Sequence, residues 1–162
     1  MLLSFIILGI SVDCPNVINL AIGLHLDASQ PAIYTQLQTD CCSGTSGTSP
    51  YVQCVSQRVT EIWWGSKGLT GTINGTALPS GLTILSFPSS SIIGPMPSTF
   101  PIGLTYMDLS QNSINGTMPK ALPSGLQTLY LNSNQMGGDI PPLPSSIIYR
   151  IPWKSFHRPS GT

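Results

Sequence analysis

The sequence predicts an α/β repeat solenoid: a right-handed coil with a parallel β-sheet on its concave face, a 3₁₀ or irregular convex side and a helical N-terminal cap. Three observations predict this fold. A pattern of 22 or 23 residues recurs four times, apolar residues alternate at the start of every unit, and the 162 residues include 16 Gly and 15 Pro, which limit helix length. A unit this short cannot bury its apolar face alone, so neighbouring units must stack.

The repeating units begin at Val59, Leu82, Leu104 and Leu126 and follow the pattern L-x-x-L-x-L-x-x-N-x-L-x-G-x-I-P. Apolar residues stand at positions four and six of each unit, while the residue between them points to the other face, which predicts a short strand. We expect the strands of successive units to pair in parallel. The inward pairs are Ile62/Trp64, Leu85/Phe87, Met107/Leu109 and Leu129/Leu131.

Position nine of the unit is expected to turn the chain. Asn112 and Asn134 occupy it in the third and fourth units, where an inward amide can bond backbone groups that would otherwise be buried without a partner. Lys67 and Ser90 occupy the same position in the first two units. The predicted ladder of amides is therefore incomplete.

The chain begins with an apolar run, Met1 to Val12, that is too short to span a bilayer, which needs about 20 residues. Gly9 and Ser11 supply small residues before a cleavage point. Residues 1–12 are therefore expected to be a secretory signal peptide, which places the protein outside the cell or at its surface. The alternative is a buried N-terminal strand or helix. No later stretch reaches about 18 apolar residues, so no membrane span is expected.

Residues 13–58 are predicted to form a disulfide-bonded cap. The cysteines are Cys14, Cys41, Cys42 and Cys54. An even number of cysteines in a secreted chain is typical of disulfides, and the CxxC spacing with nearby His that favours zinc is absent. Cys41 and Cys42 are adjacent and are not expected to bond to each other, which leaves two pairings. Helical spacing predicts helices over Pro15–Leu26 and Pro31–Gln38 that cover the first coil.

Residues 59–147 hold about four repeats, and the pattern breaks after them. A further unit would start at Ile147, one residue early, and would place Arg150 and Pro152 at its inward positions, where neither suits a buried parallel strand. Residues 148–162 are therefore expected to be a tail. It is either a degenerate C-terminal cap or a segment foreign to the fold, as in a truncated or misread gene.

The L-x-G-x-I-P ending of the repeat follows a cap with the order D-C-C, V-x-C and R-V-T, found here at Asp40-Cys41-Cys42, Val52-Gln53-Cys54 and Arg58-Val59-Thr60. In both features the chain, over about residues 14–147, resembles plant-type leucine-rich repeat proteins. That class includes polygalacturonase-inhibiting proteins and the ectodomains of receptor-like kinases, and secreted fungal arrays look similar. The resemblance implies disulfides Cys14–Cys41 and Cys42–Cys54. The chain departs from the class in its linking phrase L-P-S-G, where members usually carry a longer convex segment.

Side chains at positions three and five of each unit are expected on the concave face. Among them we predict a ligand-binding set, because Trp and Tyr offer large contact areas with a polar atom, and flat faces to sugar rings. The predicted set is Glu61, Trp63, Tyr106, Asp108 and Tyr130. The alternative is that these aromatic side chains only stabilise cross-strand packing.

Two N-x-[ST] sequons, at Asn74 and Asn115, agree with a secretory route. We expect both asparagines to carry glycans if the host is a eukaryote. The alternative is a chance occurrence of a short motif in a chain rich in Ser and Thr.

Composition and motifs argue against catalysis and against nucleic acid. Six Lys and Arg balance six Asp and Glu, and charged residues make up 7% of the chain, so no basic surface for nucleic acid or an anionic membrane is expected. The backbones of Glu61 and Asp108 would lie about 10 Å apart, two strands from each other, with no pocket implied. No P-loop, GxSxG, HExxH or GxGxxG motif occurs. We expect no enzyme activity, no cofactor and no metal.

These observations predict an extracellular, non-catalytic binding module that recognises a protein or a cell-wall polysaccharide through its concave strand face. One alternative is a structural wall or matrix component that self-associates through an open C-terminal edge. Another is a truncated receptor ectodomain. The resemblance to inhibitor and receptor proteins supports binding as a class and does not identify a ligand.

Overall fold

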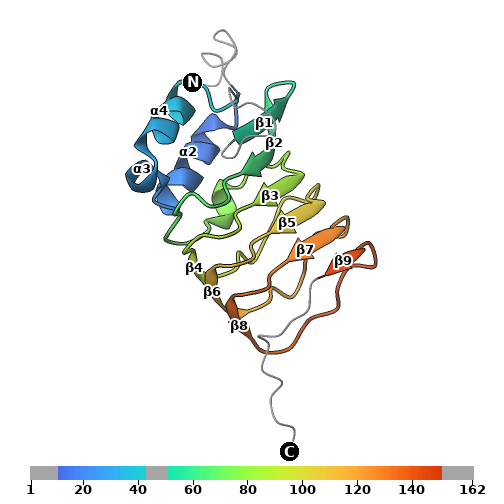
Figure 1. Cartoon of the computed structure of the whole chain (residues 1–162). Helices are drawn as coiled ribbons and strands as arrows, with labels where there is room; N and C mark the ends of the chain where they lie inside the picture. The colour runs from blue at the N-terminus through green and yellow to red at the C-terminus, as the bar shows by residue number, and fades with distance from the viewer. Residues whose placement is uncertain (1–10, 43–50, 151–162) are drawn as a thin grey trace, which may run out of the picture.

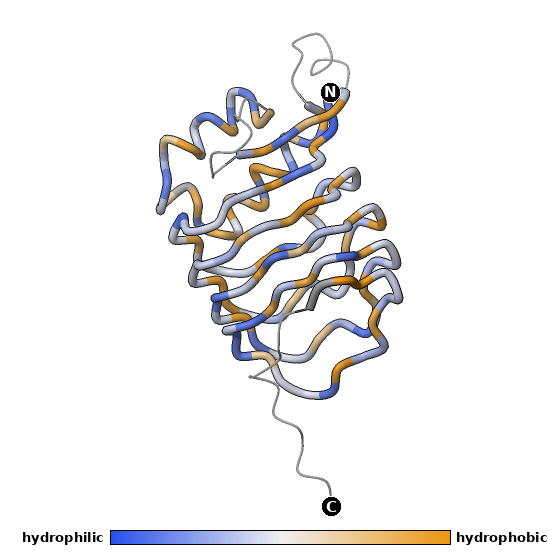
Figure 2. The backbone as a smooth tube through the Cα atoms, turned by 45° about the vertical axis from the view of Figure 1, so that its right-hand side comes forward, coloured by the Kyte–Doolittle hydropathy of each residue, from blue (hydrophilic) through white to orange (hydrophobic). Residues whose placement is uncertain are grey.

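The computed structural model describes residues 11–42 and 51–150. These residues form a solenoid of about four coils with helices packed at its N-terminal end (Figure 1). Hydrophobic and hydrophilic stretches alternate along each coil, as Figure 2 shows. The predicted solenoid is confirmed. Most of the predicted signal peptide and the end of the predicted tail, residues 1–10 and 151–162, lie outside the described residues.

The cap contains α2 (Cys14–Gly23), α3 (Leu26–Ser29) and α4 (Pro31–Thr39). A proline stands in the first turn of both α2 and α4, where its missing N–H needs no partner. Helix α2 ends three residues earlier than the predicted Leu26, just before His25, which adopts a left-handed conformation with φ 51°. Its apolar face is buried against the first coil, so the cap covers the solenoid's N-terminal end.

The concave sheet runs the length of the array. Its order is β1-β2-β3-β5-β7-β9, with every neighbouring pair parallel except the antiparallel hairpin β1–β2. The strands are β1 (Tyr51–Val55), β2 (Arg58–Trp63), β3 (Ile84–Ser86), β5 (Tyr106–Asp108), β7 (Thr128–Tyr130) and β9 (Tyr149–Arg150). Equal positions of successive units stand opposite each other, so positions three and five each form a column across the sheet.

A second sheet lies on the return side of the coils. It is parallel, with the order β4-β6-β8, and its strands are β4 (Ile93–Pro95), β6 (Ser113–Thr117) and β8 (Gln135–Gly137). The sequence analysis expected only 3₁₀ or irregular structure there, of which η1 (Gly75–Ala77) is an example. The extra sheet arises because coils of equal length bring equivalent backbone groups side by side, which permits a ladder wherever the chain is extended.

The first coil has no strand in that second sheet and pairs with the cap instead. The N–H groups of Thr70 and Thr72 donate to the carbonyl oxygens of Leu24 and Gly23, at 3.1 and 3.2 Å. The approach is so close that a Cβ on Gly71, whose φ is +81°, would overlap the carbonyl oxygen of Gly23. The end of α2 therefore takes the place of a preceding coil.

The predicted amide ladder is present in the third and fourth coils. Asn112 accepts from the Ile92 N–H at 3.0 Å and donates to the carbonyl of Phe87 at 2.8 Å, with longer bonds to two carbonyls of its own turn. Asn134 repeats this one coil later, accepting from the Ile114 N–H at 3.0 Å. At the same position in the second coil, the buried hydroxyl of Ser90 has no partner among the described residues.

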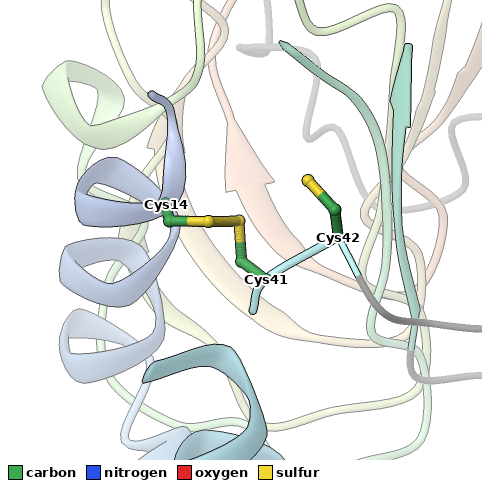
Figure 3. A group of neighbouring side chains, drawn as sticks. All are labelled: Cys14, Cys41 and Cys42. Carbon is green, nitrogen blue, oxygen red and sulfur yellow. A yellow bond between two sulfur atoms is a disulfide. The ribbon is translucent and has the colours of Figure 1, made fainter. Parts of the chain in front are cut away.

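The cap is closed by two disulfides, Cys14–Cys41 and Cys42–Cys54, with sequence separations of 27 and 12 residues. This is the pairing that the resemblance implied. The first joins the start of α2 to the turn after α4, and Cys42 lies beside it (Figure 3). The sulfurs of Cys14, Cys41 and Cys42 lie within 4.8 Å of one another, but all belong to disulfides and are not thiolate ligands.

Asp13 fixes the cap to the first coil. Its Oδ2 atom accepts from the Val59 N–H at 2.9 Å and from Arg58 Nε at 3.0 Å, and its side chain is 6% exposed. Arg58 also donates to the Ser80 hydroxyl at 2.7 Å. One buried carboxylate thus links the residue before α2, strand β2 and the first convex turn.

The concave sheet continues beyond the predicted end of the repeats. Strand β9 pairs with β7 in the register Thr128↔Tyr149, and the Ile148 N–H donates to the carbonyl of Gln127 at 2.8 Å. The first residues of the segment 148–162, predicted to be a tail, thus add a strand to the concave sheet. A backbone ladder needs only an extended chain, so an unsuitable side chain at an inward position does not prevent pairing.

Candidate functional site

Four aromatic rings cross the concave face in one connected row, which we call the aromatic ladder. It consists of Tyr51 on β1, Trp63 on β2, Tyr106 on β5 and Tyr130 on β7. Ring centroids are 6.0 Å apart for Tyr51–Trp63, 5.6 Å for Trp63–Tyr106 and 6.0 Å for Tyr106–Tyr130. The first pair is stacked and the last is edge-to-face, at 73°. Such contacts hold the rings in fixed orientations.

The ladder passes over β3, which carries no aromatic residue. Backbones two strands apart in a sheet are separated by about 10 Å, yet the Trp63 and Tyr106 rings are 5.6 Å apart, so they lean toward each other across β3. Ser86 stands between them in the sheet and is only 3% exposed, although its position faces the concave side. A small residue at this position leaves room for the two rings to meet.

Glu61 holds the first two rings of the ladder. Its Oε2 atom accepts a hydrogen bond from Trp63 Nε1 at 2.8 Å and one from the Tyr51 hydroxyl at 3.2 Å. A shared ionised acceptor makes both bonds stronger than neutral ones. Glu61, predicted as a ligand contact, therefore also orients the aromatic side chains beside it.

Asp108 lies beside the last two rings, directly opposite Tyr130 and two residues after Tyr106 on the same face. Its Oδ1 atom accepts from the N–H and the hydroxyl of Ser110, at 2.9 and 2.6 Å. Within residues 11–42 and 51–150, its Oδ2 atom has no hydrogen-bond donor. Burial raises the pKa of Tyr106, and the negative charges of Asp108 and ionised Tyr130 raise it further. The phenol of Tyr106 is therefore a neutral donor at physiological pH.

The concave face carries acids without basic residues. None of the side chains at positions three, five, seven and eight of the four units is Lys or Arg. In the described part of the chain, Arg58 pairs with Asp13 below the cap, and Lys120 lies on the convex side. The face is otherwise made of small polar residues such as Ser110 and Asn132. Positions three, five, seven and eight of the four units therefore carry two acids and no basic residue, although the whole chain is neutral.

The structure brings all five predicted ligand-binding residues onto one face. Ring contacts and hydrogen bonds connect Glu61, Trp63, Tyr106 and Tyr130, whereas Asp108 is hydrogen-bonded to Ser110. The sequence analysis missed Tyr51, which completes the ladder from the cap. Its strand turns back through Ser56 and Gln57, both with positive φ, 48° and 62°. A hairpin turn of this kind usually carries Asn or Gly, so Ser56 and Gln57 did not indicate a turn. The alternation around the buried Val52 was the only indication of a strand.

Both sequons lie away from the concave sheet with exposed asparagine side chains. Asn74 accepts from the N–H and hydroxyl of Thr76, at 3.0 and 2.8 Å, at the start of η1. Asn115 lies on β6 of the second sheet. A glycan at either residue would extend from the sides of the coils that do not carry the aromatic ladder.

Hollows on the convex side follow the proline-rich turns between the second, third and fourth coils. Their volumes are about 650, 400 and 360 Å³. Lys120 is the ionisable side chain that lines the first and the third, and the second has no ionisable lining residue. Acid–base catalysis needs paired titratable groups within reach of one reacting atom. The lining of these hollows supplies no such pair.

Comparisons with known proteins show what part of this chain and its fold are similar to. The Leucine Rich Repeat family model matches residues 103–124 and 125–147, the third and fourth coils. No curated protein matches the sequence. The chain thus contains leucine-rich repeats, and its resemblance to the plant-type class is confirmed by the family match together with the fold.

Three solved structures illustrate the similarity in fold. The PEPR1–AtPEP1 complex has a TM-score of 0.66 and 23% identity, covering 80% of this chain and 19% of that one. The BIR2 ectodomain from Arabidopsis thaliana has a TM-score of 0.56 and 23% identity, covering 82% and 72%. The BIR3–SERK2 complex from Arabidopsis thaliana has a TM-score of 0.55 and 24% identity, covering 75% and 71%. This chain therefore spans about a fifth of the length of the first.

In the parts of the chain that the structure describes, no helix has the length and apolar character needed to cross a bilayer. The longest, α2, has 10 residues.

Proposed function

We propose that the chain is an extracellular, non-catalytic module that recognises a protein partner through its concave face. The aromatic ladder is the observation that carries this proposal. Trp and Tyr side chains are enriched at protein interfaces and among the residues that dominate binding energy. Here their orientation is fixed before binding by ring contacts and by Glu61, which lowers the entropy lost when a partner is bound.

The extracellular location rests on the cap. Its two disulfides, Cys14–Cys41 and Cys42–Cys54, are bonds of a kind that forms and persists in oxidising compartments. The apolar run at residues 1–12, expected to be a signal peptide, and the exposed sequons at Asn74 and Asn115, expected to carry glycans, agree with that route. The PEPR1–AtPEP1 and BIR3–SERK2 complexes, which share the fold, support a protein as the partner.

A polysaccharide is the weaker candidate ligand for this face. Sugar rings bind aromatic side chains by stacking on an open ring face. Trp63 already stacks on Tyr51 and is tilted against Tyr106, at 20° and 36°, and all of the ladder rings are partly buried. The ladder therefore presents ring edges, hydroxyls and limited ring faces, a surface better matched to the side chains and backbone of a protein.

Selection from a displayed random peptide library tests the proposal. The folded protein is the target, and each selected peptide is measured against two variants. Trp63→Ala with Tyr106→Ala and Tyr130→Ala removes most of the ladder, whereas Ile102→Ala changes a convex side chain that is 84% exposed. We expect binding to fall at least about a hundredfold in the first, because three anchoring aromatic residues are lost, and to stay unchanged in the second.

The ladder variant must be shown to fold, because loss of structure would also abolish binding. Intact mass without reductant should show both disulfides, and circular dichroism should match that of the Ile102→Ala protein. If selected peptides bind the folded ladder variant and the original protein equally tightly, the binding site lies outside the aromatic ladder. Ladder-dependent retention of a soluble polysaccharide, with no peptide selected, would assign a glycan ligand instead.

A further inference from the structure

The end of the aromatic ladder combines aromatic walls with an unneutralised carboxylate. The Tyr106 and Tyr130 rings meet at 73° with centroids 6.0 Å apart, and Asp108 stands beside both of them in the sheet. The ring pair and the acid are therefore neighbours on the concave face, with the two rings at different orientations. Aromatic faces attract cations through their quadrupole, and a carboxylate beside such faces adds a full opposite charge.

Hydrogen bonding leaves one oxygen of this carboxylate available. Ser110 takes up Oδ1 through two short bonds, which fix the side chain's direction. Oδ2 accepts no hydrogen bond from the described residues, and Asp108 forms no ion pair with them. The other acid on the face, Glu61, also accepts two bonds through one oxygen, but its donors are the ladder side chains Trp63 and Tyr51, whereas the donor to Asp108 is Ser110.

We propose that the concave face binds a cationic side chain, Arg or Lys of an extended peptide segment, against the outer surface of the Tyr106–Tyr130 ring pair, with Asp108 Oδ2 as its counter-charge. The inference rests on the proposed function, since it names the chemistry of the partner at the same face. Charge complementarity carries it: two acids and no basic side chain line the concave columns. The neutral phenol of Tyr106 adds a hydrogen-bonding group beside the carboxylate.

Two random peptide libraries test this inference, one complete and one without Arg and Lys codons. The complete library should yield more ladder-dependent binders, and most of them should share a basic residue. Replacing that residue by citrulline or norleucine should weaken binding to the original protein about tenfold, as expected for the loss of a charge-assisted bond. The same replacement should have little effect on binding to the Asp108→Asn protein.

Asp108→Asn is a matched change, because the amide oxygen can still accept both bonds from Ser110 while the negative charge is lost. Asp139→Asn is the control, since Asp139 is an exposed acid beyond the second sheet. If both libraries yield ladder-dependent binders equally, or Asp139→Asn acts like Asp108→Asn, the cation site is wrong and the proposed function stands. If neither library yields ladder-dependent binders, the cation site and peptide recognition by this face both fail.

Discussion

The two ends of the array are held together by different chemistry. In the third and fourth coils, Asn112 and Asn134 bond the backbone of their own coil and of the preceding one. The first coil lacks such an amide and is held by the cap, through disulfides, Asp13 and pairing with α2. The second coil has neither, since Ser90 leaves its buried hydroxyl unpaired. The comparison teaches that the buried amide stabilises an internal coil and the cap stabilises the first coil, so the second coil, which has neither, is expected to be the least firmly held.

Removal of the first disulfide should have the largest effect on stability. The Cys14→Ser, Cys41→Ser protein loses a bond that closes a loop with a sequence separation of 27. Loop-closure entropy predicts a loss of about 3–4 kcal/mol in the free energy of unfolding. Urea unfolding followed by circular dichroism measures it. If the free energy of unfolding falls by well under 1 kcal/mol, non-covalent contacts are enough to keep the cap folded.

The next largest effect is expected at the amide ladder. Asn112→Ala leaves the Ile92 N–H and the Phe87 carbonyl without their partner in the core, and should destabilise the protein by about 3 kcal/mol. Ser90→Ala at the equivalent position should change stability by less than about 0.5 kcal/mol, because its hydroxyl makes no bond. Equal effects in the two variants would contradict the comparison between coils.

Asp13→Ala should weaken the junction between cap and array by about 2 kcal/mol, since the Val59 N–H loses its buried acceptor. Thermal unfolding measures this change. Asp139→Ala, at an exposed acid, is the control and should have almost no effect. In the Asp13→Ala protein, hydrogen exchange of the Val59 amide should also accelerate. Exchange in the third and fourth coils should be unchanged.

Ser90→Asn should repair the second coil. By analogy with Asn112, the new amide would meet the Leu69 N–H and the Trp64 carbonyl, which occupy the equivalent positions of the first coil. We expect a gain of about 1 kcal/mol in the free energy of unfolding. A loss instead would indicate that the packing of Trp64 on Phe87, 5.6 Å apart, leaves no room for the larger side chain.

The smallest effect concerns Tyr106 at alkaline pH. Its pKa in the folded protein is raised by burial and by nearby negative charge, so the unfolded chain loses this proton first as pH rises. Stability from this residue is thus complete below its ordinary pKa of 10 and is lost as pH rises through the higher folded value. Tyr106→Phe should flatten the alkaline decline. An unchanged profile would place the cause elsewhere.

Much of the fold could be predicted from the sequence, because repetition fixes which positions face inward. The inward pairs, the amides at Asn112 and Asn134 and the cap helix α4 follow from spacing alone. The second sheet could not be predicted in this way, since its strands are short and lack alternation. The hairpin before β2 was hidden because Ser56 and Gln57 are unusual in its turn.

The sequence allowed us to predict which side of the sheet carries the candidate site, but not how the side chains of the site contact one another. Alternation placed Glu61, Trp63 and Tyr106 on the same side of the sheet, as the structure does. The support of Trp63 by Glu61 depends on side-chain rotamers, and the contact across β3 depends on a small residue at Ser86. The spacing of residues in the sequence reveals neither contact, because each forms between side chains of different coils or different columns of the sheet.

The central claim is that ligand binding uses the aromatic ladder. Adding a selected peptide to isotope-labelled protein and recording amide chemical shifts tests it most directly. The account predicts the largest shifts at residues of β2, β5 and β7, including Glu61, Tyr106 and Tyr130, with convex residues such as Ser98 and Lys120 unmoved. Shifts concentrated around Ser98 and Lys120, with the concave strands unchanged, would contradict the claim and place the binding site on the opposite side of the coils.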